Sequence, residues 1–136
     1  MKPERVDLRG VREPRELINR VVQTRLREAQ RLAAALESRD QAELHDFRIA
    51  CKRLRYTLER FESLEPWLQP AAERLALVQD ALGEAHDRDV LLTILPPAMG
   101  QTQRRLLLDR DACVDSATKL WNELRSFIER IASHQF

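Results

Sequence analysis

The stretch LHDFRIACKRLRYTLERF, residues 44–61, indicates the fold class because its apolar side chains recur every three or four positions. At about 100° per residue, these side chains fall in one sector of an α-helix. The members of that sector are Leu44, Phe47, Ala50, Cys51, Leu54, Leu58 and Phe61. A polar stripe adjoins it, made of His45, Arg48, Lys52, Arg55 and Tyr56. The stretch therefore predicts an amphipathic helix with a cationic edge beside its apolar face.

The composition of the whole chain favours helices. Of its 136 residues, 33% are charged, 5% are aromatic and only 3 are glycine. Leu, Ala, Arg and Glu, which are strong helix formers, are abundant, whereas strands prefer β-branched and aromatic residues. The length fits one compact domain. We expect a single all-α domain over residues 1–136, with residues 1–12 as an irregular lead.

Turn residues and caps divide the chain into helical units. One helix is predicted to begin near Pro14, because proline is tolerated in a first turn, and to run to about Ser38. Asp40 is a candidate N-cap for the next helix, which lasts to about Ser63.

The second half of the chain shows the same periodicity. A third helix is expected from Pro70, and Gly83 leaves three interpretations: the end of that helix, a bend in it or a close packing contact. Residues 86–89 then predict a polar entry to a further helical stretch over 90–95, and a last helix is expected over 102–133. Four amphipathic units joined by short links predict an antiparallel helical bundle of about four long helices.

The charges predict a local site for anions. Lys and Arg number 23 against 22 for Asp and Glu, so the net charge of +1 creates no global field. Twenty of the 23 cations are arginines, which suit bidentate recognition of phosphate or carboxylate. Genomic base composition would produce the same bias. Nucleic acid is disfavoured as a partner, because stacking aromatic residues are few and the positive charge is not spread over the chain.

The two isolated cysteines and the hydropathy of the chain argue against metal-binding, disulfide-rich and membrane-spanning proteins. Cys51 and Cys113 form no CxxC pair, which disfavours a metal site and a disulfide framework. We expect no cofactor. The charged first residues lack the apolar core of a signal peptide, and no apolar run approaches the length of a membrane span. We therefore expect a cytoplasmic protein with no membrane partner.

Spacing alone leaves two interpretations of the cationic edge. Arg48, Lys52 and Arg55 can form a solvated helix edge that pairs with acidic residues three or four positions away, such as Glu59. They can equally line an anion site.

Two motifs favour the second interpretation through a family resemblance. The first is His45-x-x-Arg48-Ile49-x-x-Lys52-Arg53-x-Arg55-Tyr56, and the second is Leu82-Gly83-x-x-His86-Asp87-x-Asp89-Val90-Leu91. Together they resemble the signature of the CHAD family, the conserved histidine α-helical domain. The resemblance implies a helical domain that binds inorganic polyphosphate. Carried over residue by residue, it implies the binding set His45, Arg48, Lys52, Arg53 and Arg55.

Several residues outside this set keep two interpretations. Arg25 and Arg110 emerge toward the apolar sectors of their helices, where an unpaired charge is costly. Each arginine either adds a cation to the polyphosphate site or pairs with a buried carboxylate such as Asp87 or Asp89. Both aspartates are expected to cap a helix or to orient motif arginines. Gln79 either satisfies a backbone group or touches the ligand, and His86 is either a surface residue or part of the basic set.

The resemblance also predicts an assembly. Family domains contain two related helical halves, and this sequence carries one copy of the motif, most similar to the second half. A C2 homodimer would bring two cationic edges together, because isologous pairing is the commonest closed assembly.

The leading functional hypothesis is noncatalytic binding of polyphosphate or a similar phosphorylated polyanion. A structural or protein-interaction bundle is the alternative. A phosphohydrolase using His45 or His86 with Asp87 and Asp89 is disfavoured, because the sequence has no glycine-rich phosphate loop and no established metal pattern.

Overall fold

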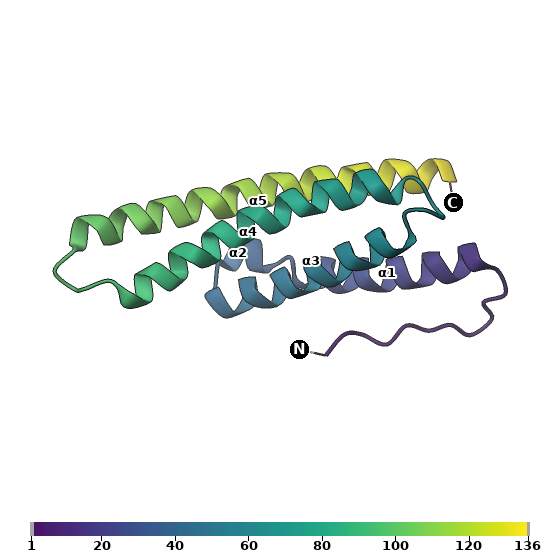
Figure 1. The fold of residues 1–136 in the computed structure, drawn as a ribbon, viewed down its shortest axis with the longest axis horizontal. Coiled ribbons are helices and arrows are strands. Elements are labelled where there is room, and N and C mark those ends of the chain that lie inside the picture. Colours follow the sequence, from purple (N-terminus) through teal and green to yellow (C-terminus); the bar gives the residue numbers. More distant parts are fainter. Residues whose placement is uncertain (1, 136) are drawn as a thin grey trace.

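The computed structural model describes the backbone of residues 2–135 and the side chains of residues 2–132. Within this range the chain forms helices and no strand. The helices are α1 (Pro14–Leu32), α2 (Ala35–Ser38), α3 (Gln41–Phe61), α4 (Leu68–Ile94) and α5 (Gly100–Gln135). The four long helices run antiparallel to their chain neighbours in one bundle, and α2 joins α1 to α3 (Figure 1). The predicted all-α antiparallel bundle is thus confirmed.

Local chemistry explains where the first helices begin. Pro14 occupies the first turn of α1, where its missing N–H has no intrahelical partner to lose. Asp40 is the N-cap of α3, as predicted, and its carboxylate accepts a hydrogen bond from the backbone N–H of Glu43 at 3.1 Å. This bond satisfies one of the N–H groups that a helix start leaves unpaired.

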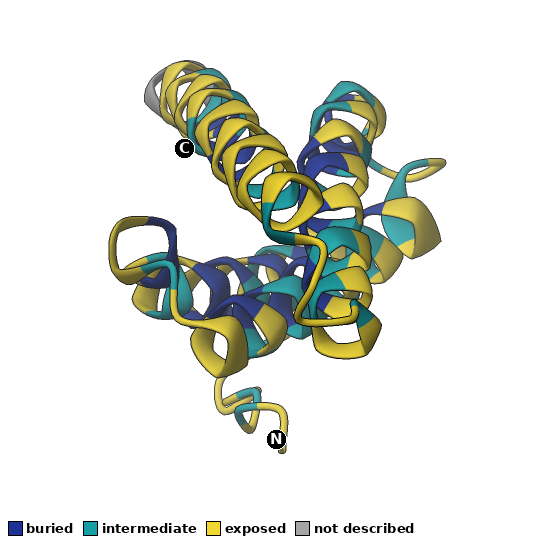
Figure 2. Cartoon of the chain, turned by 90° about the vertical axis from the view of Figure 1, so that its left-hand side faces the viewer, coloured by how far each residue is buried: buried dark blue, intermediate teal, exposed yellow. Residues whose placement is uncertain are grey.

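One core runs through the bundle. Helix α3 packs on both α1 and α4, and α4 packs on α5 along the longest contact. At the centre, Phe47 of α3 meets Trp121 of α5 edge to face, with ring centroids 5.1 Å apart. Viewed along the helices, buried residues face inward and exposed residues face outward (Figure 2). The apolar face predicted for residues 44–61 therefore lies against both neighbouring layers.

The first helix is shorter than predicted. We expected it to continue to about Ser38, but α1 ends at Leu32 and α2 forms a separate turn. The backbone N–H of Ala33 bonds the carbonyl of Gln30 instead of continuing the α-helical pattern. Arg39 then ends α2 in the left-handed conformation, with φ of 59°. These tight turns redirect the chain into α3.

The separate helical stretch predicted to start at residues 86–89 is wrong, and so is the alternative that Gly83 ends a helix. Helix α4 continues from Leu68 to Ile94, so residues 86–89 lie inside it and neither Asp87 nor Asp89 caps a helix. Glycine costs a helix roughly 1 kcal/mol relative to alanine. Buried neighbours such as Leu82 and Ala85 pack into the core on both sides of Gly83 and offset that cost. A Cβ at Gly83 would meet nothing within 4 Å, so close packing does not require the glycine either.

Two parts of the chain lie at the edges of this core. The α4–α5 hairpin projects beyond the ends of α2 and α3 (Figure 1). The irregular lead, residues 2–13, folds back alongside α1. Both are relevant to the surfaces described below.

Candidate functional site

The cationic edge of α3 borders an open groove between α3 and α4. His45, Lys52 and Tyr56 are exposed, while Arg48 and Arg55 are half-buried. The groove has a volume of about 500 Å³. Its lining consists of Arg48, Arg55, Gln79, Asp80, Gly83, Glu84 and Asp87. The two arginines of the predicted set that face this groove therefore come from α3, and the opposite wall comes from α4.

Arg55 is held in place by two partners. Its Nε lies 2.6 Å from Glu59 Oε1, and one guanidinium nitrogen donates to Gln79 Oε1 at 3.3 Å. The ion pair with Glu59 is the contact expected for a solvated edge, and that expectation is confirmed. Gln79 orients Arg55 from across the groove, and its contact with a ligand stays a prediction. Arg55 and Glu59 keep 35% and 42% of their side chains exposed, so the ion pair contributes only about 0.2–1 kcal/mol.

Lys52 extends over Tyr56 on the outer surface of α3. The ammonium nitrogen lies 5.8 Å from the centre of the ring, within the range of a cation–π contact. Lys52 is exposed in this position, so its ammonium group can still donate hydrogen bonds to solvent or to a ligand. Lys52 therefore flanks the groove and does not line it.

The α4 wall of the groove is acidic, a feature that our sequence interpretation did not include. Asp80, Glu84 and Asp87 are exposed and line the same groove as Arg48 and Arg55. Their spacing, with Asp80 and Glu84 four positions apart and Asp87 three further on, places them on one helix face. That spacing was visible in the sequence. The groove thus carries cations on one wall and carboxylates on the other.

His45 and His86 face each other across the α3–α4 contact. Their ring centroids are 6.2 Å apart, and the rings are tilted by 36°. The narrow crevice that they share is also lined by Arg48 and Asp89. His86 was considered as a surface residue or a member of the basic set, and the structure brings it to the histidine of the first motif.

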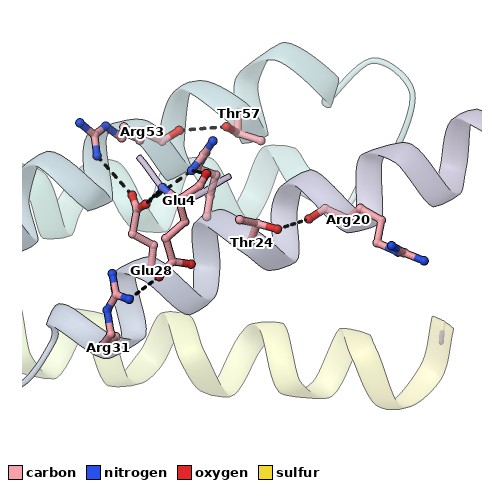
Figure 3. A network of polar contacts seen from close by, with 8 residues as sticks. Glu4, Arg20, Thr24, Glu28, Arg31, Arg53 and Thr57 are labelled. Carbon is pink, nitrogen blue, oxygen red and sulfur yellow. Dashed lines mark hydrogen bonds and ion pairs between the residues drawn. The ribbon is translucent and has the colours of Figure 1, made fainter. Parts of the chain in front are cut away.

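Arg25 and Arg53 lie away from this groove, on the α1 side of α3. Both contact the carboxylate of Glu28, each at 3.5 Å. Glu28 is 1% exposed and also accepts a hydrogen bond from the backbone N–H of Glu4 at 2.7 Å. Figure 3 shows Glu28 between α1 and α3, with Arg53 reaching it from α3 and Arg31 contacting the side chain of Glu4.

Glu28 therefore fastens the irregular lead to the bundle. Arg25 completes the connection by donating to the carbonyl of Glu4 at 2.9 Å. For Arg25, the expected buried carboxylate exists, but it is Glu28 and not Asp87 or Asp89. The i, i+3 spacing of Arg25 and Glu28 could have indicated this pair, whereas the contact with Arg53 joins residues 25 positions apart.

Arg110 forms the ion pair that one of the two interpretations predicted. Its Nε lies 2.6 Å from Asp89 Oδ1, and both side chains are nearly buried between α4 and α5. A second nitrogen of Arg110 donates to the carbonyl of Arg39. Arg39 also pairs with Asp115, whose hydrogen bond raises the pKa of the Arg39 guanidinium. This ionic contact ties α5 to α4 and to the end of α2.

A larger hollow lies elsewhere on the surface and contains none of the predicted site residues. It has a volume of about 970 Å³ and is lined by Arg74 and by α5 residues between Asp115 and Arg130. The lining mixes Lys119 and Arg130 with Asp115 and Glu123 on a surface open to solvent. Size alone does not make this hollow a better anion site than the groove beside α3, because no stripe of one charge runs along it.

Both cysteines are free thiols, with Cys51 buried and Cys113 half-buried. Burial raises the pKa of the Cys51 thiol, and burial is also the main cause that raises the pKa of Cys113. Among residues 2–132, no cluster of three histidine, cysteine or carboxylate side chains is placed to hold a metal ion. In the same part of the chain, the helices lack an apolar stretch long enough to cross a membrane.

The chain was compared with known protein families, curated proteins and solved structures, and only the comparison with families gave a match. Searches of curated proteins and of solved structures returned no significant match. A sequence model described as the CHAD domain matches residues 2–96, a region that includes α1, α2, α3 and α4 with both motifs. The match covers more than half of the 136 residues. The chain therefore belongs to the CHAD domain family.

Proposed function

We propose that this protein binds inorganic polyphosphate, or a similar phosphorylated polyanion, along α3 without transforming it. The observation that carries the proposal is the position of Arg48 and Arg55, side by side on the open groove, with His45 and Lys52 exposed on the same edge. Family membership implies the same class of ligand. The buried Arg110 pair and the α5 hollow offer no comparable row of accessible cations, and the exposed cations of the lead, such as Arg5 and Arg9, lie outside both family motifs.

The geometry of α3 suits an extended polyanion. From His45 to Arg55 the helix rises about 15 Å, at about 1.5 Å per residue. Cations repeated over that length can meet successive phosphate units. Arginine offers a planar fork of donors and lysine a compact charge. The ligand competes with Glu59 and Gln79 for Arg55. The ion pair with Glu59 is exposed and the half-buried bond to Gln79 is 3.3 Å long, so an incoming phosphate can replace both contacts.

Binding should depend strongly on salt. We extend to polyphosphate the behaviour of single-stranded nucleic acid, in which each neutralised phosphate releases condensed counterions. Three neutralised phosphates predict a loss of about 20-fold in affinity between 50 and 200 mM salt. Calorimetric titration at several salt concentrations tests this expectation. The same incubations, made with divalent metal and analysed for released phosphate and chain length, should show no shortening of the polymer.

The acidic wall gives a sharper test of the site. Replacement Asp87→Asn removes a negative charge that faces Arg48 in the groove, so we expect polyphosphate affinity to rise about two- to fivefold, because the removed repulsion corresponds to about 0.5–1 kcal/mol. Glu123→Gln makes the same change of net charge on α5 and should leave affinity nearly unchanged. Equal effects of the two replacements would show that net charge, and not this groove, controls binding.

We further propose that the protein forms a homodimer through the projecting α4–α5 hairpin. Large apolar side chains are exposed on this hairpin: Val90, Leu91, Ile94, Met99, Leu107 and Leu108. Exposed apolar patches of this kind mark interaction surfaces. The hairpin also carries the exposed residues Arg104, Arg105 and Asp109. Because this surface has charges of both signs, the same surface on a second copy can offer an opposite charge to each. A second copy related by C2 symmetry is therefore the partner that we propose.

Replacement of Ile94 and Leu108 by aspartate should abolish this dimer, because both side chains are at least 70% exposed and would place charges in the interface. Sedimentation velocity should show a dimer for the unaltered protein and a monomer for the double variant. A monomer in both cases, at concentrations up to about 100 times those used for binding, would contradict the dimer without affecting the α3 site.

A further inference from the structure

His45 and His86 line a crevice that shares Arg48 with the groove and lies nearer the start of α3. Their ring centroids are 6.2 Å apart, near the outer limit for an aromatic pair, and the 36° tilt keeps the rings from stacking flat. The crevice between them has a volume of only about 10 Å³, about one water molecule. A phosphate group therefore cannot enter between the rings but can lie across their exposed edges. His45 is exposed and His86 half-buried, so both side chains keep part of their surface accessible.

The charged groups around this pair leave it without a strong carboxylate partner. On α3, Arg48 lines the same crevice. On α4, Asp89 lines it too, but Asp89 is 8% exposed and its carboxylate is paired with Arg110 from α5. Asp87 belongs to the wall of the adjoining groove. Protonation of both imidazoles would thus place two like charges beside the guanidinium of Arg48, which repel each other.

We infer that His45 and His86 form a proton-dependent anion clamp, which binds a phosphate group together with Arg48 and takes up protons as it does so. The inference rests on the proposed function, since it concerns one end of the same site. A bound anion relieves the repulsion among the three cations, so anion binding favours protonation. By reciprocity of linked equilibria, protonation must then strengthen anion binding to the same degree. Histidine is the side chain whose unperturbed charge change lies nearest neutral pH, so a comparison of binding at pH 6 and pH 8 is the appropriate test.

Calorimetric titration with long-chain polyphosphate at pH 6 and pH 8 tests this clamp. We expect the ratio of affinities, pH 6 over pH 8, to be about tenfold larger for the unaltered protein than for the variant His45→Gln/His86→Gln. Titration in buffers of different ionisation enthalpy should show proton uptake by the unaltered protein and much less by the variant. Protonation of the polymer and of His134 is common to both proteins and cancels in the comparison.

The single replacement His86→Gln distinguishes a pair from a lone histidine. If the two rings act together, this replacement alone should remove most of the additional pH dependence, although His45 remains. Circular dichroism should confirm that both variants stay helical. Equal pH ratios and equal proton uptake in all three proteins would overturn the clamp and leave the proposed function intact. Absence of saturable binding by the unaltered protein at both pH values would instead overturn the proposed function, and the clamp with it.

Discussion

Replacement Glu28→Ala should lower the free energy of unfolding by about 2–4 kcal/mol. Removal of one partner from a buried ion pair costs about 3–5 kcal/mol, because the other charge is left uncompensated. Here the loss is reduced because Arg25 and Arg53 keep 15% and 25% of their side chains exposed and can regain some water. The lead also loses the acceptor for the N–H of Glu4. For a chain of this size, the melting temperature should fall by roughly 10 °C.

Thermal unfolding followed by circular dichroism measures this effect. Glu129→Ala is the matched control, because Glu129 also pairs with an arginine but is 71% exposed, and its removal should change stability by less than about 0.5 kcal/mol. A melting temperature for Glu28→Ala within about 2 °C of the unaltered protein would show that Glu28 does not fasten the lead. Proteolysis of residues 2–13 should accelerate in the variant if our description is correct.

Replacement of Arg48, Lys52 and Arg55 together by alanine should weaken polyphosphate binding by about 100-fold or more at low salt. Three contacts of about 1 kcal/mol each correspond to a factor of about 150. The logarithmic dependence of affinity on salt should also become shallower by about 2, because three fewer phosphates are neutralised. The fold should survive, since the ion pair of Arg55 with Glu59 is at the surface.

A second triple variant separates a local site from net charge. Arg104, Lys119 and Arg125 are exposed cations of α5, and their replacement by alanine changes the net charge by the same amount. We expect this variant to bind within about threefold of the unaltered protein. An equal loss of affinity in both triple variants, or a full retention in the first, would contradict the assignment of the site to α3.

The helices were predictable from the sequence because helix formation depends largely on residues that are close together in the chain. The apolar sector of residues 44–61 is buried as expected, and the Asp40 cap is formed as predicted. Both features depend on side chains within one or two turns of each other. The continuity of α4 through Gly83 was not predictable in the same way. It depends on packing against other helices, which outweighs the unfavourable propensity of one glycine.

The candidate site was predictable only in part. Helical spacing placed His45, Arg48, Lys52 and Arg55 on one edge, and the structure agrees. Arg53, which entered through the family motif, lies instead beside Glu28 on the opposite side of α3. No periodicity reveals a contact between residues 25 positions apart on different helices. A binding role for Arg53, Arg25 or Arg110 stays a prediction, as does a cytoplasmic location.

The most direct test of the polyphosphate site is amide chemical-shift mapping by NMR as polyphosphate is added to isotope-labelled protein. We predict that the largest perturbations lie in residues 45–59 and 79–90, along both walls of the groove, and that residues 115–126 of α5 change little. Perturbations that are centred on α5 or on the lead, or their absence at saturating ligand, would contradict the account.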